Sequence, residues 1–271
     1  MINKVTVILA FLAVCIVSVI NGGNYFDKTM SVFQTDETKS YVAIIIDDFG
    51  YGGEGTDEML SLDIPFTAAI MPFSPNAQED AKKAENAGKD IIIHMPMESL
   101  TGKKEWVGDK GVFTSLTESE IRSLTEEAIA IVGKASGLNN HMGSAIMESE
   151  KCFSIVAEVL CENNMVFVDS VTTPKSVGEK ICSQKGITFF ERDVFLDSTD
   201  DINKIKENIR KTGDIALKNG YAVAIGHVGP EGGKVTAQAL KETAAELKEK
   251  GIEFVTITRL REIYGDTGNT L

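Results

Sequence analysis

The chain of 271 residues has only four cysteines, and no two of them stand close together in the sequence. They stand far apart, at Cys15, Cys152, Cys161 and Cys182, and three of the four fall in the part with a globular composition. Widely spaced cysteines with no Cys-x-x-Cys pair exclude a zinc knuckle and argue against a disulfide framework. Stability must therefore come from a hydrophobic core, which a chain of this length can bury.

Positive charge is also scarce. Lys and Arg together number 27 against 40 Asp and Glu, so the formal net charge is −13. Nucleic-acid-binding proteins need basic patches to neutralise phosphates, and this balance argues against such a partner. It argues equally against electrostatic docking on anionic lipid. A neutral or cationic polymer is the easier partner.

The N-terminus carries the longest apolar run. Residues 5–20 are apolar or small, and Asn21 with two glycines follows them. As a helix this run would be about 24 Å long, short of the ~30 Å hydrocarbon core of a bilayer. We predict a signal peptide or signal-anchor at 1–20 and a polar linker at 21–39. The protein is then exported and extracytoplasmic, either secreted after cleavage or tethered to the membrane through residues 5–20.

From residue 40 onward, strand-like and helix-like patterns alternate. The strand-like runs mostly lack the alternation of a half-exposed strand, as expected of strands buried on both faces; they are 41–47, 66–71, 90–94, 138–142, 165–169, 187–191, 221–226 and 253–258. Helical patterns lie between them, and a capping box of Thr117 and Glu120 marks one helix start. This predicts an α/β domain over 40–264, a parallel barrel or a doubly wound sheet, followed by a tail at 265–271.

The chain has only three histidines, and each follows an apolar, strand-like run. They are His94, His141 and His227, and a fourth run ends in the pair Asp47 and Asp48. Ligands and catalytic groups collect where parallel strands end in α/β folds. One carboxylate and two imidazoles would hold a divalent cation with open positions for water. One carboxylate and one imidazole would remain for proton transfer, which favours a metal-dependent hydrolase.

A long stretch at 98–116 follows the first of these histidines and lacks a clear pattern. Such a loop at the active end of a barrel is usually a lid or a substrate wall. Glu98, four residues after His94, would be a second ligand or would orient the histidine. Trp106 is the only tryptophan of the chain. It either stacks on a sugar ring or merely pins the loop.

Three further polar residues stand at strand ends and are candidates for substrate binding or for support of the site. Asn140 precedes the second histidine, and Asp169 with Ser170 follows the apolar run at 165–168. Taken singly, the pair Asp47 and Asp48 is also explained as caps on the following loop, and His94 as a hydrogen-bonded core histidine. Only their common position favours a site.

The motifs that carry these residues resemble those of the divergent polysaccharide deacetylases, relatives of the NodB-type carbohydrate esterases. The resemblance spans about residues 40–262. In order, the motifs are IIIDDFG (44–50), HMPME (94–98), NNHMGS (139–144), VDSVTTPKS (168–176), ERDVFLD (191–197) and AIGH (224–227). The resemblance implies a distorted (β/α) barrel of seven or eight strands, in agreement with the barrel alternative above.

By the same resemblance, the protein would remove N- or O-acetyl groups from a cell-wall or related polysaccharide with one divalent metal ion, zinc by preference. Asp47 would be the catalytic base and His227 the acid. Asp48 would bind the metal with His94, and the NNHMGS motif would supply His141 as the remaining ligand.

The chain departs from the NodB-type pattern at two points, because Glu98 stands where the second histidine of His-x-x-x-His is expected and the arginine-containing motif is missing. It also departs from the divergent family, whose late motif often reads GHPHP where this chain has GHVGP. These departures keep a second hypothesis open, a non-enzymatic glycan-binding or accessory envelope protein with a degenerate site. A third hypothesis is a metal-dependent amidase or phosphoesterase. A phosphoesterase would need two metals and a basic pocket, and the sequence indicates neither.

Overall fold

The computed structural model of the protein describes residues 39–229 and 233–265. The predicted signal segment, all of the predicted linker before Lys39 and the tail from residue 266 lie outside the described residues. Within the described part, no helix combines the length and the apolar character needed to cross a bilayer.

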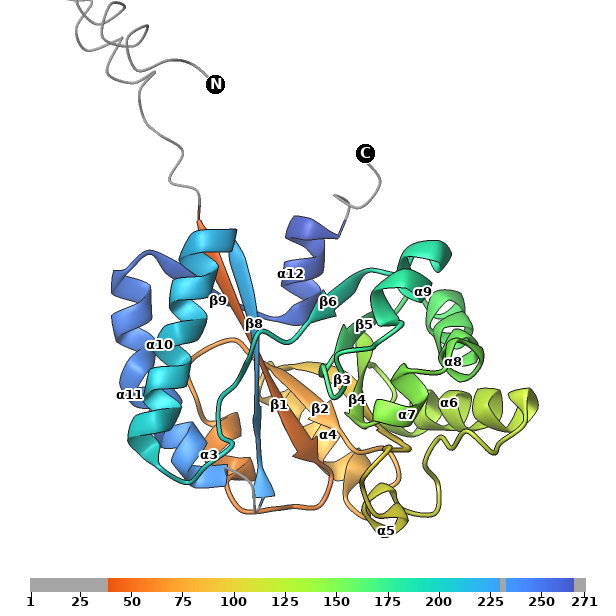
Figure 1. The fold of residues 1–271 in the computed structure, drawn as a ribbon. Helices are drawn as coiled ribbons and strands as arrows, with labels where there is room; N and C mark the ends of the chain where they lie inside the picture. Colours follow the sequence, from red (N-terminus) through yellow and green to blue (C-terminus); the bar gives the residue numbers. More distant parts are fainter. Residues whose placement is uncertain (1–38, 230–232, 266–271) are drawn as a thin grey trace, which may run out of the picture. The chain divides into compact units, whose positions relative to one another are not determined.

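A parallel sheet of nine strands forms the centre of the domain, and helices cover its outer face (Figure 1). The order along the sheet is β6-β5-β4-β3-β2-β1-β8-β7, and β9 pairs with β1 beside this path. The strands are β1 (Ser40–Phe49), β2 (Thr67–Ile70), β3 (Asp90–Met97), β4 (Gly137–Met142), β5 (Val166–Asp169), β6 (Phe189–Glu191), β7 (Val194–Phe195), β8 (Tyr221–His227) and β9 (Ile252–Val255). The predicted distorted barrel is confirmed, as a curled sheet with one open seam.

The helices connect successive strands as the alternating pattern predicts. They are α3 (Thr56–Leu60), α4 (Ala77–Asn86), α5 (Lys104–Val107), α6 (Glu118–Val132), α7 (Ser144–Met147), α8 (Glu150–Glu162), α9 (Gly178–Lys185), α10 (Ile202–Asn219), α11 (Gly233–Glu249) and α12 (Ile257–Tyr264). The capping box at the start of α6 is confirmed, because the Thr117 side chain accepts from the Glu120 amide and Glu120 accepts from the Thr117 amide.

Side chains alternate between the two faces of each strand, and this alternation divides the core in two. On β1, Val42, Ile44 and Ile46 pack in the larger cluster, which includes residues of the covering helices. Ala43 and Ile45 belong to a second cluster inside the barrel. Its other buried members come from the neighbouring strands and α12, and they are Ala69, Ile92, Val166, Val168, Phe190, Val223, Ile225, Val255, Ile257 and Leu260. The barrel interior is therefore a packed apolar core up to the point where the strands end.

The C-terminal segment closes the end of this core at which β1 begins. β9 pairs with residues 40–43 of β1, and β2 pairs with residues 45–49 of β1. The apolar run predicts a strand over 253–258, but β9 ends at Val255. Thr256 starts α12 instead, because its side chain accepts from the Arg259 amide and satisfies the helix N-terminus. Ile257 and Leu260 of α12 then enter the interior core.

The stretch 98–116 is less irregular than its sequence indicated. It contains the short helix α5, and Met97 forms an isolated bridge with Val112. The helices α5 and α7 have four residues each, and a helix that short shows no measurable hydrophobic period. The two-residue strand β7 and the helix α12 were not predicted either.

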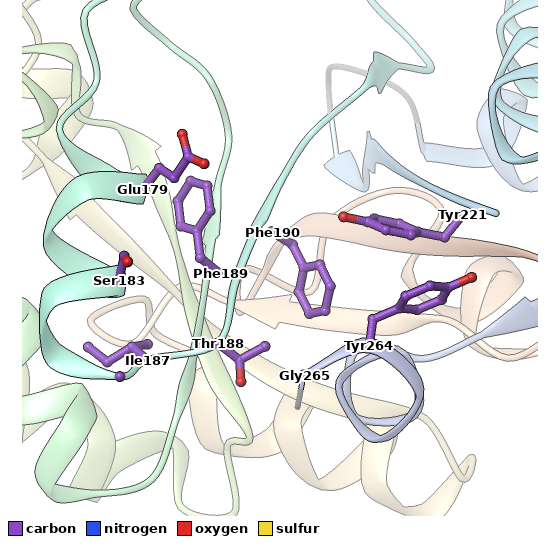
Figure 2. A pocket seen from close by; sticks show the side chains of 10 residues that line it. Glu179, Ser183, Ile187, Thr188, Phe189, Phe190, Tyr221, Tyr264 and Gly265 are labelled. Carbon is purple, nitrogen blue, oxygen red and sulfur yellow. The ribbon is translucent and has the colours of Figure 1, made fainter. Parts of the chain in front are cut away.

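The sheet stays open between β6 and β7, which only Arg192 and Asp193 separate in the chain. The Arg192 amide donates to the carbonyl of Asp169, the last residue of β5, which pairs with β6. The Asp193 amide donates to the Val223 carbonyl of β8, on the other side of the seam. A cavity of about 300 Å³ lies beside this seam, between α9 and α12 (Figure 2). Tyr221 is the first residue of β8, so the cavity lies at the end of the barrel away from the predicted site.

Candidate active site

The carboxylate pair at the end of β1 reaches one cavity because the backbone bends there. Asp47 continues the inward row of Ala43 and Ile45, whereas a regular strand would turn Asp48 outward. Asp48 instead has φ 68°, and the register between β1 and β2 shifts between Ile46 and Phe49. A positive φ is strained for a residue other than glycine, and such strain is typical of functional sites.

The other predicted residues continue the inward rows of their own strands. His94 follows Ile92 on β3 at a spacing of two residues, and His227 follows Ile225 on β8 in the same way. On β4, Asn139 is the register partner of His94, and His141 lies two residues further along the same inward row. Three strands that are separate in the sequence therefore bring Asp48, His94 and His141 together at the end of the packed interior where the strands finish.

These three side chains form a compact triangle of ligand atoms. His94 Nε2 and His141 Nδ1 each lie 3.4 Å from Asp48 Oδ1, and the two nitrogens are 3.1 Å apart. Zinc bonds of ~2.0–2.1 Å at tetrahedral angles would separate neighbouring ligand atoms by roughly 3.3–3.4 Å. The donor set of one carboxylate and two imidazoles is also one that zinc accepts. The residues present thus fit a single divalent cation.

Asn139 connects this triangle to the second carboxylate, and the sequence interpretation had assigned it no site role. Its amide nitrogen donates to Asp47 Oδ1 over 2.8 Å, so its oxygen faces His94 Nδ1, also at 2.8 Å. His94 Nδ1–H therefore donates to the amide oxygen, which leaves the Nε2 lone pair directed at the triangle. The signal was available in the sequence, because Asn139 precedes His141 by two residues and must face inward with it.

His227 is held by a second residue that had no assigned role, Asp197. His227 Nδ1–H donates to Asp197 Oδ1 over 2.8 Å, and the His227 amide donates to Asp197 Oδ2 over 2.8 Å. Thr236 also donates to Asp197 Oδ2, so the buried carboxylate is fully engaged. This arrangement fixes the imidazole and leaves Nε2 as its remaining polar atom.

An aromatic and a guanidinium group support the same histidine from the side. The Phe195 ring stacks on the His227 ring with centroids 5.7 Å apart, and the Arg192 guanidinium lies 3.7 Å from the centre of the Phe195 ring. Arg192 also donates to the carbonyls of Ser170 and Val171. The ERDVFLD segment thus supplies an arginine close to the site, although the arginine-containing motif of the NodB-type enzymes is missing from the chain.

The charge balance of the site favours a bound cation. Burial would raise the pKa of Asp48, but hydrogen bonds from His141 and His94 hold it far below its ordinary value. Burial raises the pKa of Asp47, against the opposing effect of His94 and His227. Burial disfavours a charged His94, yet Asp47 and Asp48 outweigh that effect and raise its pKa. The cluster therefore attracts positive charge, which a proton or a metal ion supplies.

A pocket of about 430 Å³ opens over these groups. Its lining includes both aspartates, all three histidines, Trp106, Asn140 and Ser170. The Trp106 ring is 60% exposed, so it does not pin the loop by burial. Asn140 accepts from the Ser170 amide and donates to the Met142 carbonyl, which ties the ends of β4 and β5 together.

Two of the predicted residues lie elsewhere. Glu98 Oε2 accepts from the amide and hydroxyl of Thr114, so it braces the loop and does not face His94. Asp169 belongs to the outward row of β5 and accepts from Ser176 and from the Val171 amide. It shapes the turn after β5. Neither residue lines the pocket.

The sequence matches that of known proteins over most of its length. Residues 44–261 match the family model of the divergent polysaccharide deacetylases. An uncharacterized protein of Haemophilus influenzae is 30% identical over 214 residues, which is 79% of this chain and 76% of that protein. The uncharacterized protein YibQ of Escherichia coli is 32% identical over 197 residues, 73% of this chain. The chain spans 61% of the length of that protein.

Solved structures with low sequence identity share the fold. An uncharacterized protein of Agrobacterium tumefaciens superposes with a TM-score of 0.73 at 17% identity, over 83% of this chain and 91% of that one. A peptidoglycan N-acetylglucosamine deacetylase gives 0.51 at 17% identity, over 84% and 95%. A mutant of a carbohydrate esterase family 4 pseudoenzyme with restored activity gives 0.52 at 16% identity, over 82% and 67%.

Proposed function

The chain belongs to the divergent polysaccharide deacetylase family, and from this premise we propose that it is a metal-dependent hydrolase that removes acetyl groups from a cell-wall or related polysaccharide. The observation that carries the proposal is the triangle of Asp48, His94 and His141 beside a buried Asp47. A structural role alone would not require three ligand atoms within 3.1–3.4 Å of one another.

Each side chain of the pocket has a place in such a reaction. Asp48 Oδ1, His94 Nε2 and His141 Nδ1 would hold the cation, with zinc the best match to the donor set. When bound, the cation would lower the pKa of water toward ~7 and polarise the acyl carbonyl. Asn139 fixes the tautomer of His94 and at the same time holds Asp47 in place.

The two remaining titratable groups would move protons. Asp47 takes a proton from the water whose oxygen attacks the acetyl carbonyl carbon. His227 donates a proton from Nε2 to the amine or alcohol as its bond to the carbonyl carbon breaks. The products are acetate and a free amino or hydroxyl group on the sugar. A protonated His227 suits this role, since its pKa is raised to about 9.

The substrate and the location of the protein are parts of the same proposal. A relative by fold acts on peptidoglycan N-acetylglucosamine, and the acidic chain is better suited to a neutral or cationic polymer than to nucleic acid. Export through residues 1–20 would deliver the enzyme to such a polymer outside the cytoplasm.

Metal content and acetate release test the proposal together. Purified protein is loaded with zinc and assayed on chitooligosaccharides and on peptidoglycan glycan fragments. We expect Asp48→Ala, His94→Ala and His141→Ala to lose bound metal by elemental analysis, and Asp47→Asn to keep metal but lose turnover. Glu98→Gln is the matched control and should keep metal, since Glu98 bonds to Thr114. Full metal retention in all three ligand variants would refute the assignment.

A second function is favoured by the departures from the NodB-type motifs, namely a glycan-binding or accessory envelope protein with a degenerate site. One structural neighbour is described as a pseudoenzyme. Binding of the same oligosaccharides without any acetate release, by protein shown to contain metal, would support this alternative over hydrolysis.

A further inference from the structure

A second pocket lies next to the catalytic pocket along the segments that follow β1 and β3. It has a volume of about 240 Å³, and its walls include Tyr51, Phe73, Pro96, Val107 and Asp109. Pockets that take whole drug-sized ligands have volumes of ~300–1,000 Å³. This one therefore has the size expected for a single ring.

The same three segments of the chain line the two pockets, although no single residue lines both. Tyr51 comes three residues after Asp48, and Pro96 comes two residues after His94, so the same strand ends line both pockets. On α5, Trp106 lines the catalytic pocket and the next residue, Val107, lines the second one. Partial burial and then the charge of Asp48 raise the pKa of Tyr51, in keeping with this closeness.

Two strongly exposed apolar side chains line these two pockets, Tyr51 the second pocket and Trp106 the catalytic one. The described residues include four large hydrophobic side chains that are strongly exposed, and three of these follow β1 or β3. They are Tyr51 at 55%, Leu100 at 61% and Trp106 at 60% exposure, whereas the fourth, Leu217, lies on α10. Clustered exposed apolar groups indicate a binding surface, and single ones do not.

We infer that the second pocket binds the sugar unit next to the one that is deacetylated, an inference that rests on the proposed function. The Tyr51 ring provides an apolar platform for the face of the sugar. Asp109 is exposed and has no hydrogen bond or ion pair with any described residue, so its carboxylate is available to a sugar hydroxyl. The substrate is then an oligomer or polymer, because a single sugar leaves this pocket empty.

Chain-length dependence of binding and turnover tests the inference. A chitooligosaccharide series, from the monosaccharide to the pentasaccharide, is given to zinc-loaded wild type, Tyr51→Ala, Tyr51→Phe and the control Leu217→Ala. Binding energy from a neighbouring unit raises kcat/KM only for substrates that have one. We expect Tyr51→Ala to lower kcat/KM by about tenfold for the longer substrates and not for the monosaccharide. Tyr51→Phe keeps the ring and should behave as wild type, as should Leu217→Ala.

Affinity is measured in parallel by calorimetry on the Asp47→Asn background, so that the result does not depend on turnover. Loss of pentasaccharide affinity in Tyr51→Ala without any hydrolysis by wild type would uphold the pocket and overturn the deacetylase proposal. An unchanged affinity and an unchanged chain-length dependence would overturn the pocket assignment. An equal loss for all chain lengths would do the same, because it would place Tyr51 in the catalytic pocket.

Discussion

At the scale of single residues, Asn139 is the link between metal binding and proton transfer. Its side-chain oxygen accepts a hydrogen bond from His94, and its side-chain nitrogen donates one to Asp47. Asn139→Asp keeps the acceptor but replaces the donor with a second carboxylate. Two adjacent carboxylates tend to share one proton, so the pKa of Asp47 rises further and the base is lost. We expect about 10–100-fold lower turnover with metal content retained.

Acetate release and elemental analysis on the same preparation check this prediction. Asn203→Asp, an exposed position on α10, is the matched control. Unchanged turnover in Asn139→Asp would show that the amide donor to Asp47 has no catalytic importance.

Asp197 sets the pH range over which His227 can act as an acid. Burial works against the charged imidazole, but the hydrogen bond to Asp197 and the charge of Asp47 outweigh it and raise the pKa of His227 to about 9. A group with a raised pKa keeps its proton below that value and loses it as the pH rises through it. Activity should therefore fall on the alkaline side, and Asp197→Asn should move that fall to lower pH.

The pH profile of kcat/KM with a chitooligosaccharide measures the shift. Asp193→Asn serves as the control, because Asp193 accepts from the Val223 amide and does not contact His227. If the alkaline fall stays in place in Asp197→Asn, the acid is a different group.

At the scale of elements, helix α4 holds the loop that follows β1. Asp80 is fully buried, and its Oδ2 accepts from the amides of Gly50 and Gly52 at 2.8 and 3.1 Å. Gly50 has φ 120°, and a Cβ there would lie 2.0 Å from Ser74 Oγ, so the loop requires glycine. This anchoring stabilises the strained backbone of Asp48 just before it.

Asp80→Ala should therefore weaken both the fold and the metal site. Loss of the two hydrogen bonds should lower the free energy of unfolding by about 1–3 kcal/mol, and zinc affinity should fall with it. Asp80→Asn keeps an acceptor oxygen and should retain most of both. Chemical unfolding and zinc titration measure the two effects, with the exposed Glu79→Ala as control. Equal zinc affinity in wild type and Asp80→Ala would show that the loop holds Asp48 without help from α4.

The sequence predicted most of the long strands and helices and the polar residues at the strand ends. It did not predict the features of the site that depend on backbone strain or on contacts between strands. The period of two along buried strands places Asp47, His94 and His227 on one side, and strand order then brings them together. The position of Asp48 depends on a positive φ that its sequence does not reveal. The roles of Asn139 and Asp197 depend on partners from other strands, and a single sequence does not specify those contacts.

At the scale of the whole molecule, the parallel sheet places the candidate site on a contiguous set of strands. Asp47 and Asp48 on β1, His94 on β3, His141 on β4 and His227 on β8 belong to the run β4-β3-β2-β1-β8. The seam between β6 and β7 lies outside this run. The alternation of strands and helices was enough to predict an α/β domain, but it left a closed barrel and an open sheet unresolved. The choice depends on how the two edge strands meet, and here only two residues join them.

In a closed barrel, the number of strands and their stagger fix the circumference. Here no hydrogen-bonded ladder joins β6 to β7. Residues added between Arg192 and Asp193 would therefore increase the circumference of the sheet. They would not change the pairing of the strands that carry the proposed metal ligands and the proposed acid. The contact of Arg192 with the Phe195 ring, which stacks on His227, sets a limit on such insertions, because added residues would separate the guanidinium from the ring.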